Sequence, residues 1–413
     1  MKRTGNGLRL MPFADNKRIL FGDYILEATP SLTDATEAQL IPVIYPDALM
    51  NNPIVTHHWS EIVISPDNRH MAWTTLVTGG AINFLGTLKR HDAHYSVDQV
   101  TVISTTDSIV ADPDNPGFHM ALPMRGGEIK QFIRNGEWLS LAGTTGRSMP
   151  DSVIQSLTDE SLEAITHLPS YEETTIFSPD ERLGIVMSTR GSAKTNLAIY
   201  GLMPRPYANL INLAQHAYLY SIAAVRFFRQ GNIGPVLIDI ERSKHEPDYR
   251  GVQLNDPEEQ WVYHSPMSWH PSSQATIWPE GLRGTRQMRI RIARLLDYQP
   301  AATVTTSEAQ TPDITPYSIA LEDGLASAVA PALSVTFKGR VSGTAQYDRG
   351  ENVPLGQAMT TSVVYSDYCD DGETVYNGFE RVSPGENGTT VYEAQLRATR
   401  EGQDIAEMDL RLC

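Results

Sequence analysis

The sequence predicts an all-β protein built around a six-bladed β-propeller, and three observations support this prediction. One pattern recurs, in which a β-rich run, a tight turn and a second apolar run follow one another. The copies repeat at the period of a four-stranded propeller blade. The 413 residues include 30 Gly and 26 Pro, which is typical of many short strands joined by tight turns. A propeller closes radially and leaves only short sheet edges exposed.

The clearest copies are centred on three turns, Ser65-Pro66-Asp67, Ser178-Pro179-Asp180 and His270-Pro271-Ser272. The proline presets φ at the second turn position, and Asp or Ser caps the turn. With three fainter copies, the equivalent positions are 14, 65, 133, 178, 228 and 270, at intervals of 42 to 68 residues. A blade takes about 40 to 50 residues. Six starts therefore predict six blades, with an insertion in the longest interval.

This strand, Ser-Pro-Asp turn, strand repeat resembles the TolB-like and WD40-like propeller repeats, over about residues 13 to 300. The resemblance implies a fold and is almost silent on activity. The Gly-His and Trp-Asp signatures of true WD40 repeats are missing, which disfavours a protein-interaction scaffold of that kind.

Three regions are expected along the chain. Residues 1–310 form the propeller, residues 311–332 a linker or long loop rich in small and polar residues, and residues 333–413 a C-terminal antiparallel β-rich extension that packs on the propeller. Alternating apolar residues and hairpin turns at Asp371-Gly372 and Asn387-Gly388 indicate the extension. The alternative is that its strands supply a seventh or eighth blade.

The net charge of -16 disfavours nucleic acid and anionic membrane surfaces as partners. No apolar run is long enough to span a membrane, and the start of the chain lacks a signal peptide, so we expect a soluble protein, cytoplasmic or secreted with its signal removed. Cys369 and Cys413 allow one disulfide at most. The oligomeric state stays open.

Polar and aromatic residues recur where the first strand of a blade begins. Because these strand starts converge around the propeller axis, we expect a common funnel there. The second strand returns antiparallel and brings two arginines to the same mouth. The expected catalytic residues are His58, His264, Tyr263 and Glu172, and the expected substrate-binding residues are Trp59, Tyr171, Arg190, Met267 and Arg283.

These residue types suit an oxygenated organic molecule. Aromatic walls stack on it, Arg and Tyr donate to its oxygens, and His or Glu moves a proton. The alternative is that each Tyr and His only hydrogen-bonds a neighbouring blade. No metal or cofactor is expected, since the closest approach to a ligand pair, His91 and His94, lies on an expected exposed loop.

The sequence thus predicts a cofactor-free enzyme that acts on a small, largely apolar molecule by acid/base-assisted dehydration, elimination or cyclisation. The segments 263–271 and 278–284 resemble propeller proteins of natural-product pathways, and this resemblance implies a lyase or cyclase of the hetero-Diels–Alderase type. One alternative is a carbohydrate-active lyase or hydrolase, but the predicted ring holds few carboxylates, only Glu172 and Glu61, where sugar hydrolysis uses a pair. The other alternative is a binding propeller without catalysis.

Overall fold

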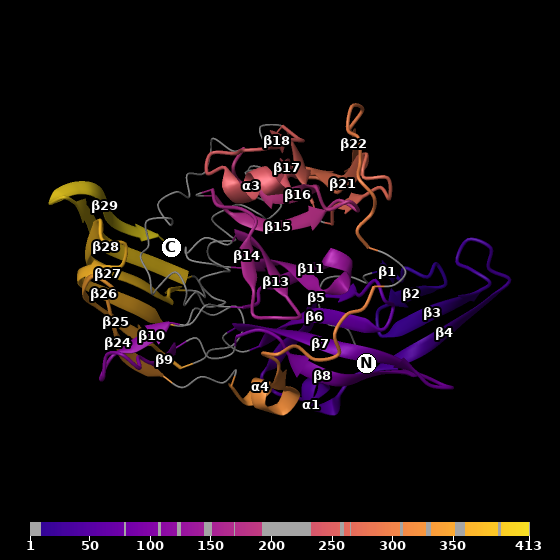
Figure 1. The fold of residues 1–413 in the computed structure, drawn as a ribbon, viewed down its shortest axis with the longest axis horizontal. Coiled ribbons are helices and arrows are strands. Elements are labelled where there is room, and N and C mark those ends of the chain that lie inside the picture. The colour runs from indigo at the N-terminus through magenta and orange to yellow at the C-terminus, as the bar shows by residue number, and fades with distance from the viewer. Residues whose placement is uncertain are drawn as a thin grey trace.

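The computed structural model of the chain consists mostly of antiparallel strands (Figure 1). None of the helices among the described residues has the length and apolar character needed to cross a lipid bilayer. The structure describes residues 10–77, 80–105, 109–121, 125–143, 151–168, 170–191, 233–256, 260–264, 266–305, 309–327, 332–351, 360–386 and 390–412.

The N-terminal strands form one large sheet. Strands β1 to β4 and strands β5 to β8 are two antiparallel meanders, and their edge strands β4 and β8 pair in parallel at Val43 and Tyr95. Side chains from both meanders, among them Ile41 and Trp73, share one buried core, which the short helices α1 (Asp47–Met50) and α4 (Leu321–Ser327) also contact. The strand bounds are Leu10–Pro12, Arg18–Phe21, Tyr24–Thr29, Glu37–Ile44, Val55–Ile64, His70–Val77, Gly80–Arg90 and Tyr95–Val102; β8 also pairs with β23 (Ile319–Ala320).

Three further antiparallel sheets follow. They are β11–β14 (Glu128–Ile133, Trp138–Gly143, Asp151–Ser156, Leu162–Ala164), β15–β18 (Glu172–Phe177, Leu183–Ser188, Gly234–Asp239, Val252–Gln253) and β19–β22 (Trp261–Tyr263, Ser268–Trp269, Ala275–Leu282, Met288–Arg294). The short helices η1 (Arg134–Gly136) and α3 (Ile240–His245) lie between their strands.

The predicted turns coincide with strand connections. Positions 14, 65 and 178 lie between the first two strands of a repeat, and position 133 ends the first strand of its repeat. Position 270 lies between β20 and β21. The turn expected at 228 falls within residues 192–232, outside the described residues, and the strands on either side of that stretch, β16 and β17, pair with each other.

The sheets stack face to face, as propeller blades do. One apolar core lies between β5–β8 and β11–β14 and includes Leu85 and Leu141. A second core lies between β11–β14 and β15–β18 and includes Trp138 and Phe177. Successive sheets thus bury each other's faces, and the all-β, propeller-type architecture predicted from the repeats is confirmed.

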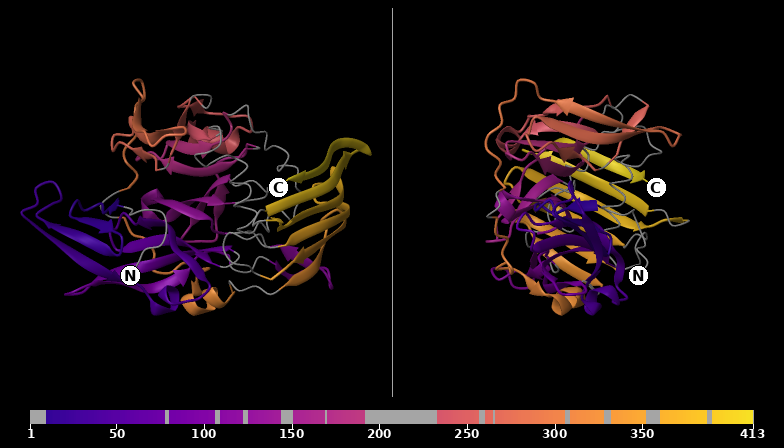
Figure 2. Two further views of the ribbon diagram at one scale, coloured as in Figure 1. Left: turned by 180° about the vertical axis from the view of Figure 1, so that it is seen from behind. Right: turned by 90° about the vertical axis from the view of Figure 1, so that its right-hand side faces the viewer.

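The C-terminal strands β24 to β29 form a curved antiparallel meander beside the stacked sheets (Figure 2). The hairpin β9–β10 (Ile109–Ala111, His119–Ala121) joins its edge, because His119 pairs in parallel with Phe337. This hairpin comes from the interval in which the repeat spacing predicts an insertion. The strand bounds are Leu333–Lys338, Ser342–Arg349, Thr361–Cys369, Thr374–Pro384, Thr390–Arg400 and Gln403–Leu412.

Residues 295–305 and 309–318, here called the strap, bind the turns of three successive sheets. The Tyr298 hydroxyl donates to Asp180 Oδ2 at 2.6 Å, and Thr311 Oγ1 donates to the carbonyl oxygen of Gly136 at 2.9 Å. Asp313 Oδ1 lies 2.7 Å from Nε2 of the buried His70, whose Nδ1 contacts Asp67 at 2.6 Å. Burial opposes a charge on His70, but the two carboxylates outweigh it and raise the pKa of its imidazole.

We predict that His70 stabilises the fold in a pH-dependent way. Because its pKa is raised on folding, its contribution is complete below the unfolded value of about 6.5 and is lost as the pH rises through the folded pKa. His70→Gln should therefore lower the unfolding free energy by roughly 1–3 kcal/mol at pH 6 and by less at pH 9. Urea denaturation at both pH values measures this. His270→Gln, at an exposed turn histidine, is the control, and an equal loss at both pH values would contradict the prediction.

Candidate functional site

The first strands of three stacked sheets meet at one buried lysine. Lys130 in β11 places its Nζ 2.9 Å from Glu61 of β5, 3.1 Å from Glu128 and 3.7 Å from Glu173 of β15. The side chains of Lys130, Glu61 and Glu173 are almost fully buried. We call Lys130 with these three glutamates the lysine cluster. It is the place where inner strands of different sheets bring polar groups together.

Glu173 is the titratable group of the lysine cluster. Burial raises its pKa to about 7, against the attraction of Lys130, while the nearby Glu128 raises it further. The Tyr171 hydroxyl donates to Glu173 Oε2 at 3.3 Å. Since one ammonium group faces three carboxyl groups, a proton on Glu173 relieves an excess of negative charge. A carboxyl with a pKa near 7 can both give and take a proton at neutral pH.

Glu172, predicted as catalytic, points the other way. Glu173 lies beside Lys130 and Tyr171, whereas Glu172 lies beside Arg190 and Ser188. Its Oε2 accepts from Arg190 Nη2 at 2.8 Å and its Oε1 from Ser188 Oγ at 2.8 Å. The predicted neighbours Glu172 and Arg190 are thus brought together, in a buried ion pair apart from the lysine cluster. The predicted catalytic role of Glu172 stays a prediction.

Tyr263 and His264 are neighbours in the chain but have different surroundings. Tyr263 is buried opposite Glu280 in β21, on the face that also carries Trp278. The His264 ring is half-buried and packs against Gly281, where an added Cβ would lie 2.9 Å from Nε2. Burial lowers the pKa of His264. At most one of these neighbours can therefore face a given site.

The remaining predicted residues are distributed over several places. His58, half-buried in β5, has its Nε2 3.2 Å from the carbonyl oxygen of Met50, beside α1. Trp59 lies in β5, and its side chain is outside the described part of the structure. Met267 is buried, and the half-buried Arg283 donates its backbone N–H to Gln260 at the strand start that the sequence predicts.

Three predicted residues share one apolar cluster with the C-terminal sheet. Tyr171, Tyr263 and Met267 belong to a continuous set of buried side chains, here called the tyrosine cluster. It extends into the C-terminal sheet through four more tyrosines and several aliphatic residues, including Tyr347, Tyr365, Tyr368, Tyr392, Val363 and Leu396. The blades therefore pack against the C-terminal sheet through one aromatic, weakly polar cluster of buried side chains.

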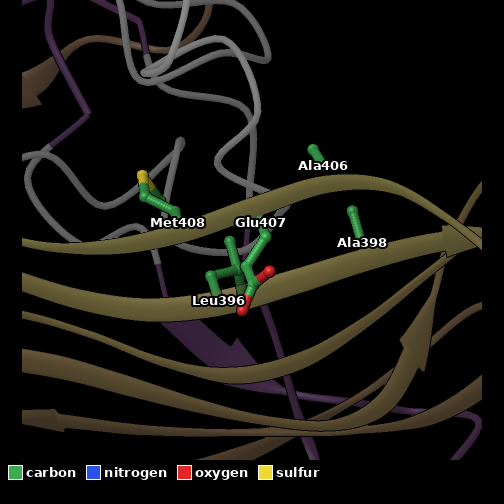
Figure 3. Close-up of a pocket in the computed structure, with 5 residues that line it drawn as sticks. All are labelled: Leu396, Ala398, Ala406, Glu407 and Met408. Carbon is green, nitrogen blue, oxygen red and sulfur yellow. The ribbon is translucent and has the colours of Figure 1, made fainter.

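A small apolar recess opens at the outer end of this sheet. Leu396 and Ala398 from β28 and Ala406, Glu407 and Met408 from β29 line it (Figure 3). Glu407 is the one polar residue among those that line the recess, so the recess has few groups that could bind a polar ligand or take part in a reaction. Within the described ranges, no group of three or more His, Cys, Asp or Glu side chains is placed to hold a metal ion.

The sequence reasoning missed Lys130, Glu128 and Glu173. For Glu173 the available signal was its place two residues beyond Tyr171, an expected site residue whose hydroxyl contacts it. Lys130 lies in β11, and this strand precedes a turn without the Ser-Pro-Asp motif. Glu380, buried in β27 between two tyrosines, was missed because the C-terminal strands were considered only as structure.

The chain is similar to several solved structures, but its sequence identity to them is low. No family model matches the chain, and no curated protein matches it. A protein assigned as TolB from Agrobacterium tumefaciens is 10% identical over 70% of this chain and 76% of its own, with a TM-score of 0.39. TolB from Acinetobacter baumannii is 9% identical over 88% and 64%, with a TM-score of 0.31. Prolyl oligopeptidase B from Galerina marginata is 7% identical over 95% and 55%, with a TM-score of 0.34.

The TolB proteins are those that the Ser-Pro-Asp repeats resemble. The chain spans less than two thirds of the length of the Acinetobacter and Galerina proteins. At these scores the likeness carries no conclusion on activity, and the fold rests on the strand pairing described above.

We predict that replacing Lys130 destabilises the fold, because the buried carboxylates lose the cation that compensates their charge. Lys130→Met leaves three glutamates without their shared cation, which should lower the unfolding free energy by about 3–5 kcal/mol at pH 8. The loss should shrink at pH 5, because the carboxyl groups can then take up protons. Urea midpoints at both pH values test this, with Lys89→Met on an exposed position of β7 as the control. A loss that does not depend on pH would contradict the charge account.

Proposed function

We propose that the chain is a cofactor-free enzyme that binds a small, largely apolar, oxygenated organic molecule at the tyrosine cluster and moves protons on it. The observation that carries this proposal is the continuity of the tyrosine cluster. It joins Tyr171, Tyr263 and Met267 from the blades to the tyrosines of the C-terminal sheet, directly beside the carboxyl group of Glu173.

The character of the side chains favours an apolar ligand. Aromatic rings and Met267 offer dispersion and stacking, and tyrosine hydroxyls add a few directed hydrogen bonds to oxygen atoms. A sugar would need many more polar groups around it. The carbohydrate-active alternative is therefore the weaker one, and a binding protein without catalysis differs from our proposal only in the role of Glu173.

Glu173 supplies the chemistry in this proposal. Its pKa of about 7 lets it accept a proton from one atom of the molecule and return it to another. Dehydration, elimination and cyclisation all require such a transfer or the holding of two reacting parts in one geometry. A cyclase of the hetero-Diels–Alderase type is the finer form of the proposal, because aromatic walls can order two unsaturated parts of one molecule.

Binding of a model ligand tests the site. We expect 2-naphthol, an aromatic alcohol, to bind the wild-type protein in calorimetric titration, and Tyr263→Ala to weaken that binding roughly tenfold because a buried aromatic wall is lost. Tyr24→Ala, at an exposed tyrosine of β3, should leave the affinity unchanged. Binding of maltoheptaose in place of 2-naphthol would support the carbohydrate alternative and refute our proposal.

Catalysis can be tested with a panel of cyclic and aromatic alcohols, followed by mass spectrometry for the loss of water. Glu173→Gln should slow the reaction of any alcohol that the wild type dehydrates by about a hundred- to ten-thousandfold. Its rate should also lose the pH dependence centred near 7 that the wild type is expected to show. Arg291→Ala, at an exposed residue of β22, should react at the wild-type rate. Binding of the alcohols without any reaction would favour the non-catalytic alternative.

A further inference from the structure

Glu380 is a buried carboxyl group on the inner face of the C-terminal sheet. It lies in β27, and its side chain is fully buried. Its two oxygens accept from two tyrosines, Oε2 from the Tyr365 hydroxyl and Oε1 from the Tyr392 hydroxyl, each at 3.2 Å. Both tyrosines belong to the tyrosine cluster.

Glu380 differs from the other buried glutamates of the described residues. Glu172 is paired with Arg190, Glu280 with Arg289, and Glu61 and Glu173 with Lys130. Glu380 has only the two hydroxyl donors. A carboxylate buried without a cation is costly, so the group is expected to hold its proton. Burial raises its pKa to about 8, although both tyrosine hydrogen bonds lower it, and the side chain is mostly a neutral acid at pH 7.

The arrangement suits a group that changes its protonation state. A purely structural position in an apolar sheet would be cheaper to fill with an aliphatic side chain. Here each oxygen has its own hydroxyl donor, and those donors stabilise the carboxylate that remains after the proton has left. An apolar site that keeps a carboxylic acid neutral, with tyrosine beside it, is a known way to direct an acidic hydrogen at a substrate oxygen.

We propose that Glu380 is the proton donor for the molecule bound at the tyrosine cluster, and that this molecule carries a hydroxyl group on its reacting carbon. This inference rests on the proposed function, which places the molecule there. The O–H bond of Glu380 breaks as its proton moves to the leaving hydroxyl, and the C–O bond breaks with its electron pair leaving as water. Glu173 takes the proton from the adjoining carbon, which forms the double bond, while the carboxylate of Glu380 is held by Tyr365 and Tyr392. Proton exchange with water then restores the ionised Glu173 and the neutral Glu380.

Infrared spectroscopy tests the protonation state without any substrate. The wild type should show the carbonyl stretch of protonated carboxylic acid, with a component that disappears with a midpoint near pH 8 and is missing in Glu380→Gln. Tyr365→Phe and Tyr392→Phe should each raise the midpoint, because each removes a donor to the carboxylate. Glu407→Gln, at an exposed position of the same sheet, should keep the band. Carbonyl bands of equal intensity in the wild type and in Glu380→Gln at pH 6 would overturn the proposal, because Glu173 contributes to the band in both proteins.

A ligand pair tests whether Glu380 faces a bound oxygen. Titration with 2-naphthol should shift the Glu380 band, and naphthalene, which lacks the oxygen, should not. Glu380→Gln should bind 2-naphthol roughly tenfold more weakly and naphthalene as the wild type does. If 2-naphthol binds both proteins equally while Tyr263→Ala weakens it, this inference fails and the proposed function stands. If neither compound binds the wild type, the proposed function fails and this inference fails with it.

Discussion

The neutralisation of buried carboxyl groups is the constraint on which the centre of this molecule depends. The stacking of the sheets brings Glu61 of β5, Glu128 of β11 and Glu173 of β15 to one place. Removing such charges from water costs several kcal/mol each unless a cation or a proton compensates them. Lys130 provides one positive charge for three acids, and the pKa of Glu173 is raised chiefly by burial and further by the nearby Glu128, against the attraction of Lys130. The same attraction ties β5, β11 and β15 together, so the chemistry of the site and the cohesion of the stack share one origin.

The protein neutralises buried acids in three different ways. Arginine pairs with two of them, Arg190 with Glu172 at 2.8 Å and Arg289 with Glu280 at 2.6 Å. In the lysine cluster, the single ammonium group of Lys130 lies within ion-pair distance of three glutamates. Glu380 relies on its own proton, supported by two tyrosines. In the second and third arrangements burial raises the pKa of Glu173 to about 7 and that of Glu380 to about 8, and both groups lie beside the tyrosine cluster.

Much of the fold could be predicted from the sequence, because Ser-Pro-Asp turns constrain the backbone locally and their spacing carries the period. The joining of the first two meanders could not, since pairing of β4 with β8 depends on contacts between Val43 and Tyr95 that no local pattern encodes. Tyr171, Tyr263 and Met267 belong to one buried apolar cluster, and their predicted roles toward a substrate stay predictions. Glu172 and Glu173 are neighbours in the chain, yet Glu172 lies beside Arg190 and Glu173 beside Lys130, and no local pattern indicates which of the two glutamates joins which cluster. His58 and His264 hold similar positions in the sequence repeats but have different surroundings in the structure. His58 lies beside α1, and His264 packs against Gly281.

The strap has a consequence for the order in which the chain can fold. Asp313 meets His70 across 243 residues of sequence, and Thr311 meets Gly136 across 175. During synthesis on the ribosome, the residues of the early sheets are made long before Thr311 and Asp313. Until then, the polar groups of His70 and Gly136 lack these hydrogen-bond partners. Contacts of such long range slow folding, because the entropy of closing a large loop is spent before the contacts form. The turns at His70 and Gly136 therefore obtain these partners only after the segment near residue 313 has been synthesised.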